Sequence, residues 1–309
     1  MKVLLTGGSG MVGRNILEHK DASQYKILSP SRDELNLLDR DQVQVYLKKE
    51  LPDFVIHTAG RVGGIEANLS NQLEFFRENI DIGMNLIYST YSLGIKKLIN
   101  LSSSCMYPKD ADNPITESMI LKGQLETTNE GYALSKTVTT RLCEYINMQD
   151  RGRNFKTIIP CNIYGRHDNF NKESSHLIPA IISKIHKAKV SGLNEVKIWG
   201  DGKARREMMF AADLADFIFL AIDRFEELPQ NINVGLGQDH TVLEYYKIVA
   251  DVLGYKGEFK FDLTKPKGVH QKTVDITLLK KLNWQSNTKL FDGISQAYNF
   301  FKEGLRNEL

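Results

Sequence analysis

The stretch LLTGGSGMVG, residues 4–13, decides the fold of this 309-residue chain. An apolar strand predicted at Val3–Leu5 leads into a glycine turn, and an amphipathic helix is predicted directly after it, at Met11–Glu18. Glycines let a backbone approach a pyrophosphate closely, and the amides of a helix N-terminus face its negative charge. The spacing is G-x-x-G-x-x-G rather than G-x-G-x-x-G, so the turn alone does not establish the site. We expect a dinucleotide to contact Gly7, Ser9, Gly10, Met11, Val12 and Gly13.

Strand and helix signals alternate along the first 165 residues. Apolar runs predict strands, and a period of 3.6 residues predicts helices between them. This alternation is typical of an α/β fold with a Rossmann-type, doubly wound parallel sheet, which binds ligands at the carboxyl ends of its strands. Strands are expected at 3–5, 25–28, 54–57, 97–100 and 157–160, and helices at 11–18, 41–49, 73–92 and 132–147.

Beyond residue 165 the pattern becomes mixed. Helical periodicity covers 176–187 and 211–224, residues 196–199 look extended, and 257–275 resemble an extended segment with a turn. We therefore expect a dinucleotide-binding domain at 1–165. A smaller C-terminal lobe, mainly substrate-binding, is expected at 166–309, with some segments returning to the first domain.

Composition narrows the class of protein. Charged residues make up 25%, hydrophobic residues 41%, and the net charge is +2, a balance that argues against nucleic acid or a membrane surface as a partner. The chain begins with a strand rather than a signal peptide, and its longest apolar run, near 217–222, is too short to cross a bilayer. Its three cysteines lack metal-ligand spacing. We expect a cytoplasmic enzyme without a metal.

Tyr132 and Lys136 lie four residues apart in GYALSK, on one face of a predicted helix. The Lys136 ammonium is expected to lower the pKa of the phenol and give it acid–base character. A lone Y-x-x-x-K occurs often by chance, but its position downstream of the glycine turn indicates a short-chain dehydrogenase/reductase. Ser103 follows the fourth predicted strand, where its hydroxyl can hydrogen-bond a substrate carbonyl or simply cap the strand.

Several longer segments resemble the GDP-L-fucose synthase family of extended short-chain reductases. They are RVGGIEANLSN (61–71), SSCMYPK (103–109), TNEGYALSK (128–136), NIYGRHDNF (162–170), SSHLIPA (174–180) and WGDGKARRE (199–207). The resemblance runs from the glycine turn to KPKG near residue 265. It implies a 3,5-epimerase and 4-reductase that acts on a GDP-linked 4-keto-6-deoxy sugar with NADPH.

The resemblance also assigns catalytic roles. Ser103, Tyr132 and Lys136 would carry the reduction, with Tyr132 protonating O4 as hydride reaches C4. Cys105 and His176 match the family's epimerisation pair, which moves protons at the carbons flanking the C4 ketone. Taken without the resemblance, Cys105 would be a small buried side chain and His176 a surface residue at a helix start.

On the cofactor side, the resemblance adds Lys136, Asn162, Ile163 and His176 as contacts of NADP. Arg32, just past the second predicted strand, lies where an acidic residue would bind the ribose of NAD, so its guanidinium suits the 2′-phosphate of NADP. Arg32 as a solvated surface residue is the alternative. The family usually has a second arginine at the position of Ser9, which predicts a weaker preference for NADP.

The substrate residues that the resemblance implies match the family with some departures. Arg206 can grip a diphosphate oxygen in a bidentate fashion, and Trp199 can offer its apolar face to the sugar or base, or belong to the core. Lys184 replaces a common arginine, and Lys267 replaces a common aspartate. Cys161 and Arg61 occupy positions where the family has a threonine and a lysine. The implied contacts with the GDP-sugar are Lys184, Trp199, Arg206, Lys267 and Lys272.

Other functions stay open. Two rivals share the reductase chemistry: a C4 reductase of a GDP-4-keto-6-deoxy-heptose without epimerisation, and a C5-epimerase and C4-reductase of a GDP-4-keto-3,6-dideoxy sugar. A 4,6-dehydratase would need an acid pair where Ser104 and Cys105 stand. A non-catalytic NADP-binding regulator would need no Ser103, Tyr132 and Lys136 together. By analogy, a homodimer is expected, packed through the predicted helices at 73–92 and 132–147.

Overall fold

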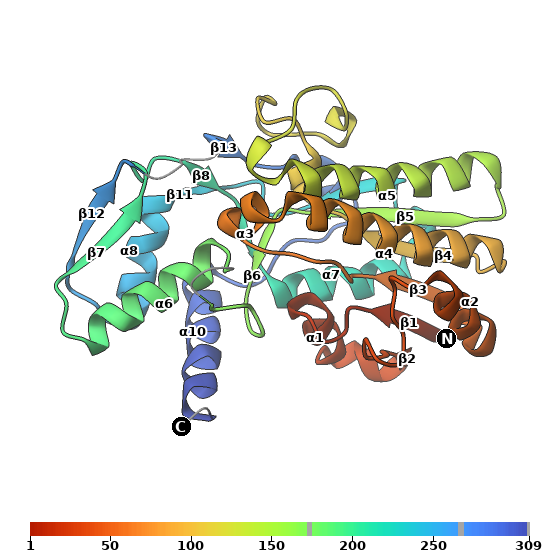
Figure 1. Cartoon of the computed structure of the whole chain (residues 1–309), viewed down its shortest axis with the longest axis horizontal. Coiled ribbons are helices and arrows are strands. Elements are labelled where there is room, and N and C mark those ends of the chain that lie inside the picture. Colours follow the sequence, from red (N-terminus) through yellow and green to blue (C-terminus); the bar gives the residue numbers. More distant parts are fainter. Residues whose placement is uncertain (172–174, 265–268, 308–309) are drawn as a thin grey trace.

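A six-stranded parallel sheet forms the centre of the larger part of the molecule (Figure 1). This computed structural model describes residues 1–171, 175–264 and 269–307. The strand order is β10-β5-β4-β3-β1-β2, which confirms the Rossmann-type, doubly wound sheet. The strands are β1 (Lys2–Thr6), β2 (Lys26–Leu28), β3 (Phe54–His57), β4 (Lys97–Leu101), β5 (Asn154–Pro160) and β10 (Asn231–Val234).

Helices cover both faces of this sheet. Successive side chains of a strand point to opposite faces, so Val3 and Leu5 join one apolar cluster and Leu4 joins another. One face packs against α1 (Met11–Leu17), α7 (Ala211–Asp223) and α9 (Thr277–Lys281). The other packs against α2 (Arg40–Glu50), α4 (Gln72–Ser92) and α5 (Glu130–Gln149).

Segments from beyond residue 165 complete the first part of the molecule. Strand β10 pairs with β5, from Asn231 opposite Thr157 to Val234 opposite Pro160. Helices α7 and α9 add Leu214, Phe217 and Leu279 to the same core. The chain thus returns to the sheet after leaving it. The boundary at residue 165 between a cofactor domain and a substrate lobe stays a prediction.

The smaller part of the molecule has its own core. Helices α6 (Leu177–Val190), α8 (Val242–Leu253) and α10 (Leu290–Asn307) pack around it, and β7 (Glu195–Trp199) pairs in parallel with β12 (Glu258–Asp262). The core side chains include Ile178, Ile182, Ile198, Tyr245 and Val249. The segment expected to be extended at 257–275 accordingly contains β12 and, after the turn, β13 (Gln271–Lys272).

Two small sheets lie near the junction of the two parts (Figure 1). One has the order β11-β8-β13, with β8 at Arg205–Arg206 and β11 at His240–Thr241. The other pairs β6 (Asn162–Tyr164) with β9 (Met208–Phe210). Helix α3 (Ile65–Ser70) precedes α4. No helix within the described ranges is long and apolar enough to cross a membrane.

Candidate active site

Ser103, Cys105 and Tyr132 come together where β4 ends. Ser103 lies two residues past Leu101, and a short 3₁₀ helix at Ser104–Met106 follows it. The Cys105 amide donates to the Ser103 hydroxyl at 3.2 Å, and that hydroxyl lies close enough to the Tyr132 phenol to lower its pKa. Tyr132 projects from the first turn of α5 and is half-buried. Carboxyl ends of parallel strands are the usual place for a site in such folds.

Lys136 lies one turn after Tyr132 on α5 and is buried. Its ammonium donates to the Leu101 carbonyl at 3.0 Å and lies 5.8 Å from the centroid of the Tyr132 ring. The pKa of this phenol is raised and not lowered, contrary to the expectation from the sequence. Burial is the main cause, a thiolate at Cys105 would raise the pKa further, and the Ser103 hydroxyl lowers it. Burial also lowers the pKa of Lys136 to about 8.

Cys105 is the one cysteine of the three that solvent reaches. Its sulfur accepts a hydrogen bond from Asn129 Nδ2 at 3.2 Å. Asn129 directly precedes α5 and therefore stands beside Tyr132's helix turn. The sequence did not predict this contact, because residues 24 apart on a loop share no period. The only signal was that both residues fall in the quoted segments SSCMYPK and TNEGYALSK.

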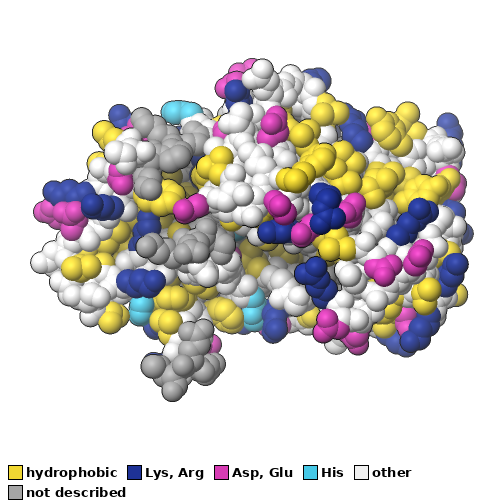
Figure 2. Space-filling view, in the orientation of Figure 1, with side chains coloured by type: hydrophobic (Ala, Val, Ile, Leu, Met, Phe, Trp, Pro, Cys, Tyr) yellow, Lys and Arg dark blue, Asp and Glu magenta, His cyan; other side chains and the backbone are white. Residues whose placement is uncertain are grey.

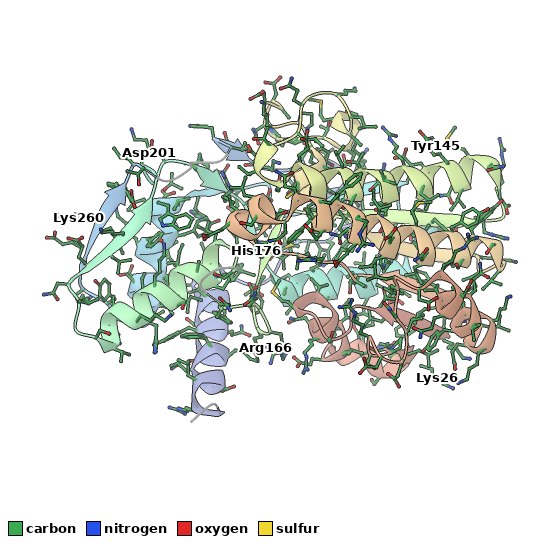
Figure 3. All side chains as sticks on the ribbon, viewed as in Figure 1. Lys26, Tyr145, Arg166, His176, Asp201 and Lys260 are labelled. Carbon is green, nitrogen blue, oxygen red and sulfur yellow. The ribbon has the colours of Figure 1, made fainter. Side chains whose placement is uncertain are left out.

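His176 belongs to the smaller part of the molecule, immediately before α6 (Figure 3). It lies near the junction with the larger part (Figure 3). Although solvent reaches the imidazole, the protein around it displaces enough water to lower its pKa. Its pairing with Cys105 across a substrate stays a prediction.

The glycine turn fits a dinucleotide. Gly7 has φ +79°, and a Cβ there would lie 2.7 Å from the Ala59 amide nitrogen. At Gly13 a Cβ would lie 2.2 Å from the Gly7 carbonyl oxygen, so the turn can pack against α1 only with glycine. Gly10 precedes α1, whose first amides receive no side-chain cap. Those amides are open to an anion, as pyrophosphate binding requires. Ser9 is exposed at the same turn.

The other expected cofactor contacts surround this turn. Arg32 is exposed in the loop after β2, and Gly8 packs so closely on Ser29 of that loop that a Cβ would lie 1.8 Å from its hydroxyl oxygen. Arg32 therefore stands on the segment next to the glycine turn, with its side chain in solvent. Met11 and Val12 begin α1, and Asn162 and Ile163 lie on β6. Asn162 Nδ2 donates to the Glu207 carbonyl at 3.0 Å.

Lys184 and Trp199 are neighbours in the smaller part of the molecule. The Lys184 ammonium lies 5.0 Å from the centroid of the Trp199 ring and 3.4 Å from the Tyr246 hydroxyl. Trp199 ends β7 and is 41% exposed, so it is not a core side chain. An exposed aromatic face beside a cation suits a base or sugar next to a phosphate. Lys267 lies outside the described residues.

Arg206 and Lys272 stand opposite each other on β8 and β13. Burial lowers the pKa of both, while the negative forms of Cys105 and Glu126 favour their charged states. These two cations therefore lie within electrostatic range of the Cys105 sulfur. Arg206 also donates to the Val269 carbonyl at 2.6 Å. The structure thus brings the strand pair with two expected substrate contacts toward the loop that holds Cys105.

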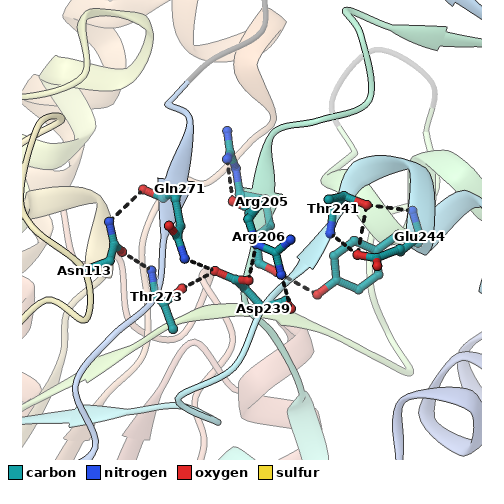
Figure 4. A network of polar contacts seen from close by, with 9 residues as sticks. Asn113, Arg205, Arg206, Asp239, Thr241, Glu244, Gln271 and Thr273 are labelled. Atoms are coloured by element: carbon teal, nitrogen blue, oxygen red, sulfur yellow. Dashed lines mark hydrogen bonds and ion pairs between the residues drawn. The ribbon is translucent and has the colours of Figure 1, made fainter.

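A buried carboxylate ties the three short strands together (Figure 4). Asp239, just before β11, accepts from Arg205 Nε at 2.6 Å and from Gln271 Nε2 at 2.7 Å. It also accepts from the Thr273 hydroxyl. Burial would raise the pKa of Asp239, but these hydrogen bonds outweigh burial and lower it. Asn113, from the long loop after β4, accepts from the Thr273 amide at 2.7 Å.

Comparison with known protein families decides the chain's membership. Residues 3–235 match the model of the NAD dependent epimerase/dehydratase family. The chain belongs to that family. The family match covers the glycine turn, the Tyr132 and Lys136 pair and the strands that carry Arg206. The chain is therefore an enzyme, as the sequence predicted.

Individual relatives refine the placement within the epimerase/dehydratase family. The chain is 52% identical over 308 residues to GDP-L-colitose synthase of Yersinia pseudotuberculosis, covering 100% of both chains. It is 47% identical to GDP-L-fucose synthase of Azorhizobium caulinodans, covering 98% of this chain and 97% of the relative. The resemblance to the GDP-L-fucose synthase group is thereby confirmed.

Solved structures agree in fold over nearly the whole chain. A GDP-6-OMe-4-keto-L-xylo-heptose reductase from Campylobacter jejuni superposes with a TM-score of 0.90 at 28% identity, covering 98% of each chain. A GDP-L-fucose synthetase from Naegleria fowleri, bound to NADP, gives 0.88 at 25% identity, covering 99% of this chain and 95% of the other. The fold is thus one on which several GDP-sugar reductases are built.

Proposed function

We propose that this chain is an NADPH-dependent epimerase/reductase that converts GDP-4-keto-6-deoxy-D-mannose to GDP-L-fucose. The observation that carries the proposal is that the Ser103 hydroxyl and the Tyr132 phenol lie close together beside Cys105 at the carboxyl end of β4. Reduction requires a proton donor at the oxygen of the C4 ketone. Epimerisation requires acid–base groups at the two carbons next to that ketone. Identity of 47% to a GDP-L-fucose synthase along nearly the full chain supports the same substrate.

Reduction depends on Tyr132 as the proton donor. Bound NADPH supplies a hydride for C4. Because burial raises the pKa of Tyr132, the phenol keeps its proton at working pH and can give it to O4. Ser103 hydrogen-bonds the same oxygen and holds the charge that develops there. The Lys136 ammonium stabilises the tyrosinate that remains.

Epimerisation depends on the acidity of the protons next to the ketone. Loss of a proton from C3 or C5 gives an enolate, whose oxygen Ser103 and Tyr132 can stabilise. Inversion needs a base on one face and an acid on the other. Cys105 and His176 would fill these roles. Arg206 and Lys272, both within electrostatic range of Cys105, would bind the diphosphate. Lys184 and Trp199 would contact the nucleotide end.

NADP is the cofactor that the loop after β2 suits best. Arg32 is exposed beside the glycine turn, and its guanidinium can bind a 2′-phosphate. Ser9 adds a hydroxyl donor but no charge. The NADP in the similar Naegleria structure supports the same choice here.

A second candidate substrate is a GDP-4-keto-3,6-dideoxy sugar. Colitose is a 3,6-dideoxy hexose, so its C3 is no stereocentre and only C5 would be inverted. The support is the 52% identity to GDP-L-colitose synthase, which exceeds that to the fucose synthase. A third candidate is C4 reduction of a GDP-4-keto-6-deoxy-heptose without epimerisation. The similar heptose reductase, at a TM-score of 0.90 but 28% identity, supports this candidate less strongly.

One experiment separates the candidates. The enzyme is given NADPH with the GDP-linked 4-keto-6-deoxy-mannose, its 3-deoxy analogue or a 4-keto-6-deoxy-heptose, and products are identified by NMR. We expect the highest kcat/KM with the first and a product inverted at C3 and C5. A preference for the 3-deoxy sugar would replace the first candidate by the second. Reduction without inversion would leave only the C4 reductase.

We also propose a cytoplasmic homodimer. Apolar side chains remain exposed along α4 and α5, over the region where hydrophobic atoms gather in Figure 2. They include Leu73, Phe76, Leu134 and Val138. Ile87 and Ile146, on the same two helices, are instead buried in the core, because they face the sheet. A second copy packed on this face would cover the exposed set.

A further inference from the structure

Asn129 departs from the usual behaviour of an asparagine at a helix start. It is the N-cap residue of α5, with φ −141° and ψ 25°, yet its side chain makes no cap hydrogen bond. Its Oδ1 atom is buried and has no hydrogen-bond partner among the described residues. Asparagine is favoured at this position because its oxygen accepts from the first amides of the helix. Asn129 forgoes that stabilisation.

The amide nitrogen of Asn129 is directed at a sulfur instead. Nδ2 lies 3.2 Å from Cys105 Sγ, within the range of a hydrogen bond to sulfur. An N–H donor in this place makes the sulfur an acceptor. Two cations, Arg206 and Lys272, also lie within electrostatic range of Cys105. Functional sites often contain a residue that gives up a local stabilising contact, here the helix cap, for a contact with a neighbouring group, here the Cys105 sulfur.

We infer that Asn129 is a positioning residue that holds the Cys105 sulfur as a hydrogen-bond acceptor, ready to take a proton from the substrate carbon. In that step a C–H bond breaks and an S–H bond forms, and the electron pair passes to the enolate oxygen. The inference rests on the proposed function, because it assumes that Cys105 moves protons at the sugar. Neither the resemblance nor the family match points to Asn129 in this role.

Thiol alkylation provides a direct test. The enzyme, loaded with NADP⁺, is treated with iodoacetamide from pH 6 to 10, and the modified residue is identified by mass spectrometry. Cys143 and Cys161 are buried, so Cys105 is the site of reaction, and Cys105→Ser gives the background. Asn129→Ala should move the midpoint of the profile to higher pH. One pH unit would lower the rate near neutral pH about tenfold.

Two further variants refine the test. Asn129→Asp keeps the shape but replaces the donor by a negative charge, and should shift the midpoint further than Asn129→Ala. Asn129→Ser can cap α5 but is too short to reach the sulfur, so it should shift the midpoint while keeping the helix intact. Unchanged midpoints in all three variants would overturn the inference.

Asn71 offers a matched control. It is the N-cap of α4, with φ −140° and ψ 39°, and it also makes no cap hydrogen bond. Its Nδ2 donates to the Ala67 carbonyl, away from Cys105. Asn71→Ala should leave the alkylation profile unchanged; a shift equal to that of Asn129→Ala would show that any cap change perturbs the thiol and would overturn the inference.

Exchange of substrate protons with D₂O separates this inference from the proposed function. If the wild type exchanges protons at C3 or C5 and Asn129→Ala has a normal alkylation profile, the inference fails and the proposed function stands. If the wild type shows no exchange but the Asn129 variants shift the profile, the contact of Asn129 with the thiol stands, and the epimerase function falls with the proton-taking role.

Discussion

Lys136 makes reduction sensitive to pH. Burial lowers its pKa to about 8, from an ordinary value near 10.5, so the ammonium is charged below pH 8 and neutral above it. Tyr132, whose pKa is raised, keeps its proton throughout this range. The tyrosinate left after proton donation needs the ammonium. We therefore expect kcat for reduction to fall as pH rises through about 8, measured with saturating NADPH. A rate independent of pH from 7 to 10 would contradict this role, and Tyr132→Phe provides the background.

Arg32 should set the preference for NADPH over NADH. A charged hydrogen bond is worth about 1.5–3 kcal/mol, so Arg32→Ala should reduce discrimination by roughly 10- to 100-fold, mainly through KM for NADPH. The control is Arg151→Ala, an exposed arginine in the turn before β5, a strand that β4, β3 and β1 separate from β2. If Arg32→Ala distinguishes NADPH from NADH as well as the wild type does, another residue binds the 2′-phosphate.

Sequence alone identified the candidate catalytic side chains but not their hydrogen-bond partners. The four-residue spacing of Tyr132 and Lys136 is a property of a helix, so a pattern reveals it. The hydrogen bond from Lys136 to the Leu101 carbonyl depends on how α5 packs on β4, which no local pattern encodes. For the same reason burial, rather than the neighbouring ammonium, determines the pKa of Tyr132.

At the scale of elements, long segments were predictable and short ones were not. Strands β1 and β3 and helices α4 and α5 have enough residues to display a period, and they match expectation within three residues at each end. Strands β8, β11 and β13 have two residues each, too few for any period, and they form because Asp239 joins Arg205, Gln271 and Thr273. Two expected substrate residues, Arg206 and Lys272, lie on these strands.

Asp239 should therefore control substrate binding from a distance. Asp239→Asn removes the charge that pairs with Arg205, worth about 1–3 kcal/mol, and loosens the strands that carry Arg206 and Lys272. KM for the GDP-sugar should rise about tenfold, with kcat changed less than threefold, in steady-state kinetics. Glu227→Gln is the control, because Glu227 also pairs with an arginine, Arg224, but at the end of α7. A fall in kcat at unchanged KM would contradict this account.

At the scale of the whole molecule, the exposed apolar stripe of α4 and α5 predicts association. Val138 is 38% exposed in the middle of α5. Val138→Glu would place a charge in the proposed interface, so we expect a monomer by light scattering where the wild type is a dimer. Val190→Glu, at the end of α6, is the matched control, because that valine is exposed far from the stripe. A wild type that is monomeric by light scattering would contradict the proposed homodimer.

The arrangement of the two parts explains why both are needed for the chemistry. Ser103, Cys105 and Tyr132 belong to the sheet-bearing part, whereas His176, Lys184 and Trp199 belong to the smaller part. The sequence predicted that the chain returns to the sheet, and β10 pairs with β5 there. The sequence did not predict that Asp239 and β11 would follow directly after β10. Parallel pairing of distant segments leaves no local signal in either of them.

The most direct test of the bifunctional account is proton exchange without reduction. The enzyme is incubated with GDP-4-keto-6-deoxy-D-mannose and NADP⁺ in D₂O, and deuterium at C3 and C5 is followed by NMR and mass spectrometry. Exchange needs only enolisation, so it reports on epimerisation separately from hydride transfer. We predict deuterium at both carbons and a loss of about 10²-fold or more in Cys105→Ser, whose hydroxyl is a far weaker acid than a thiol. No deuterium at either carbon in the wild type would contradict the account and leave a C4 reductase.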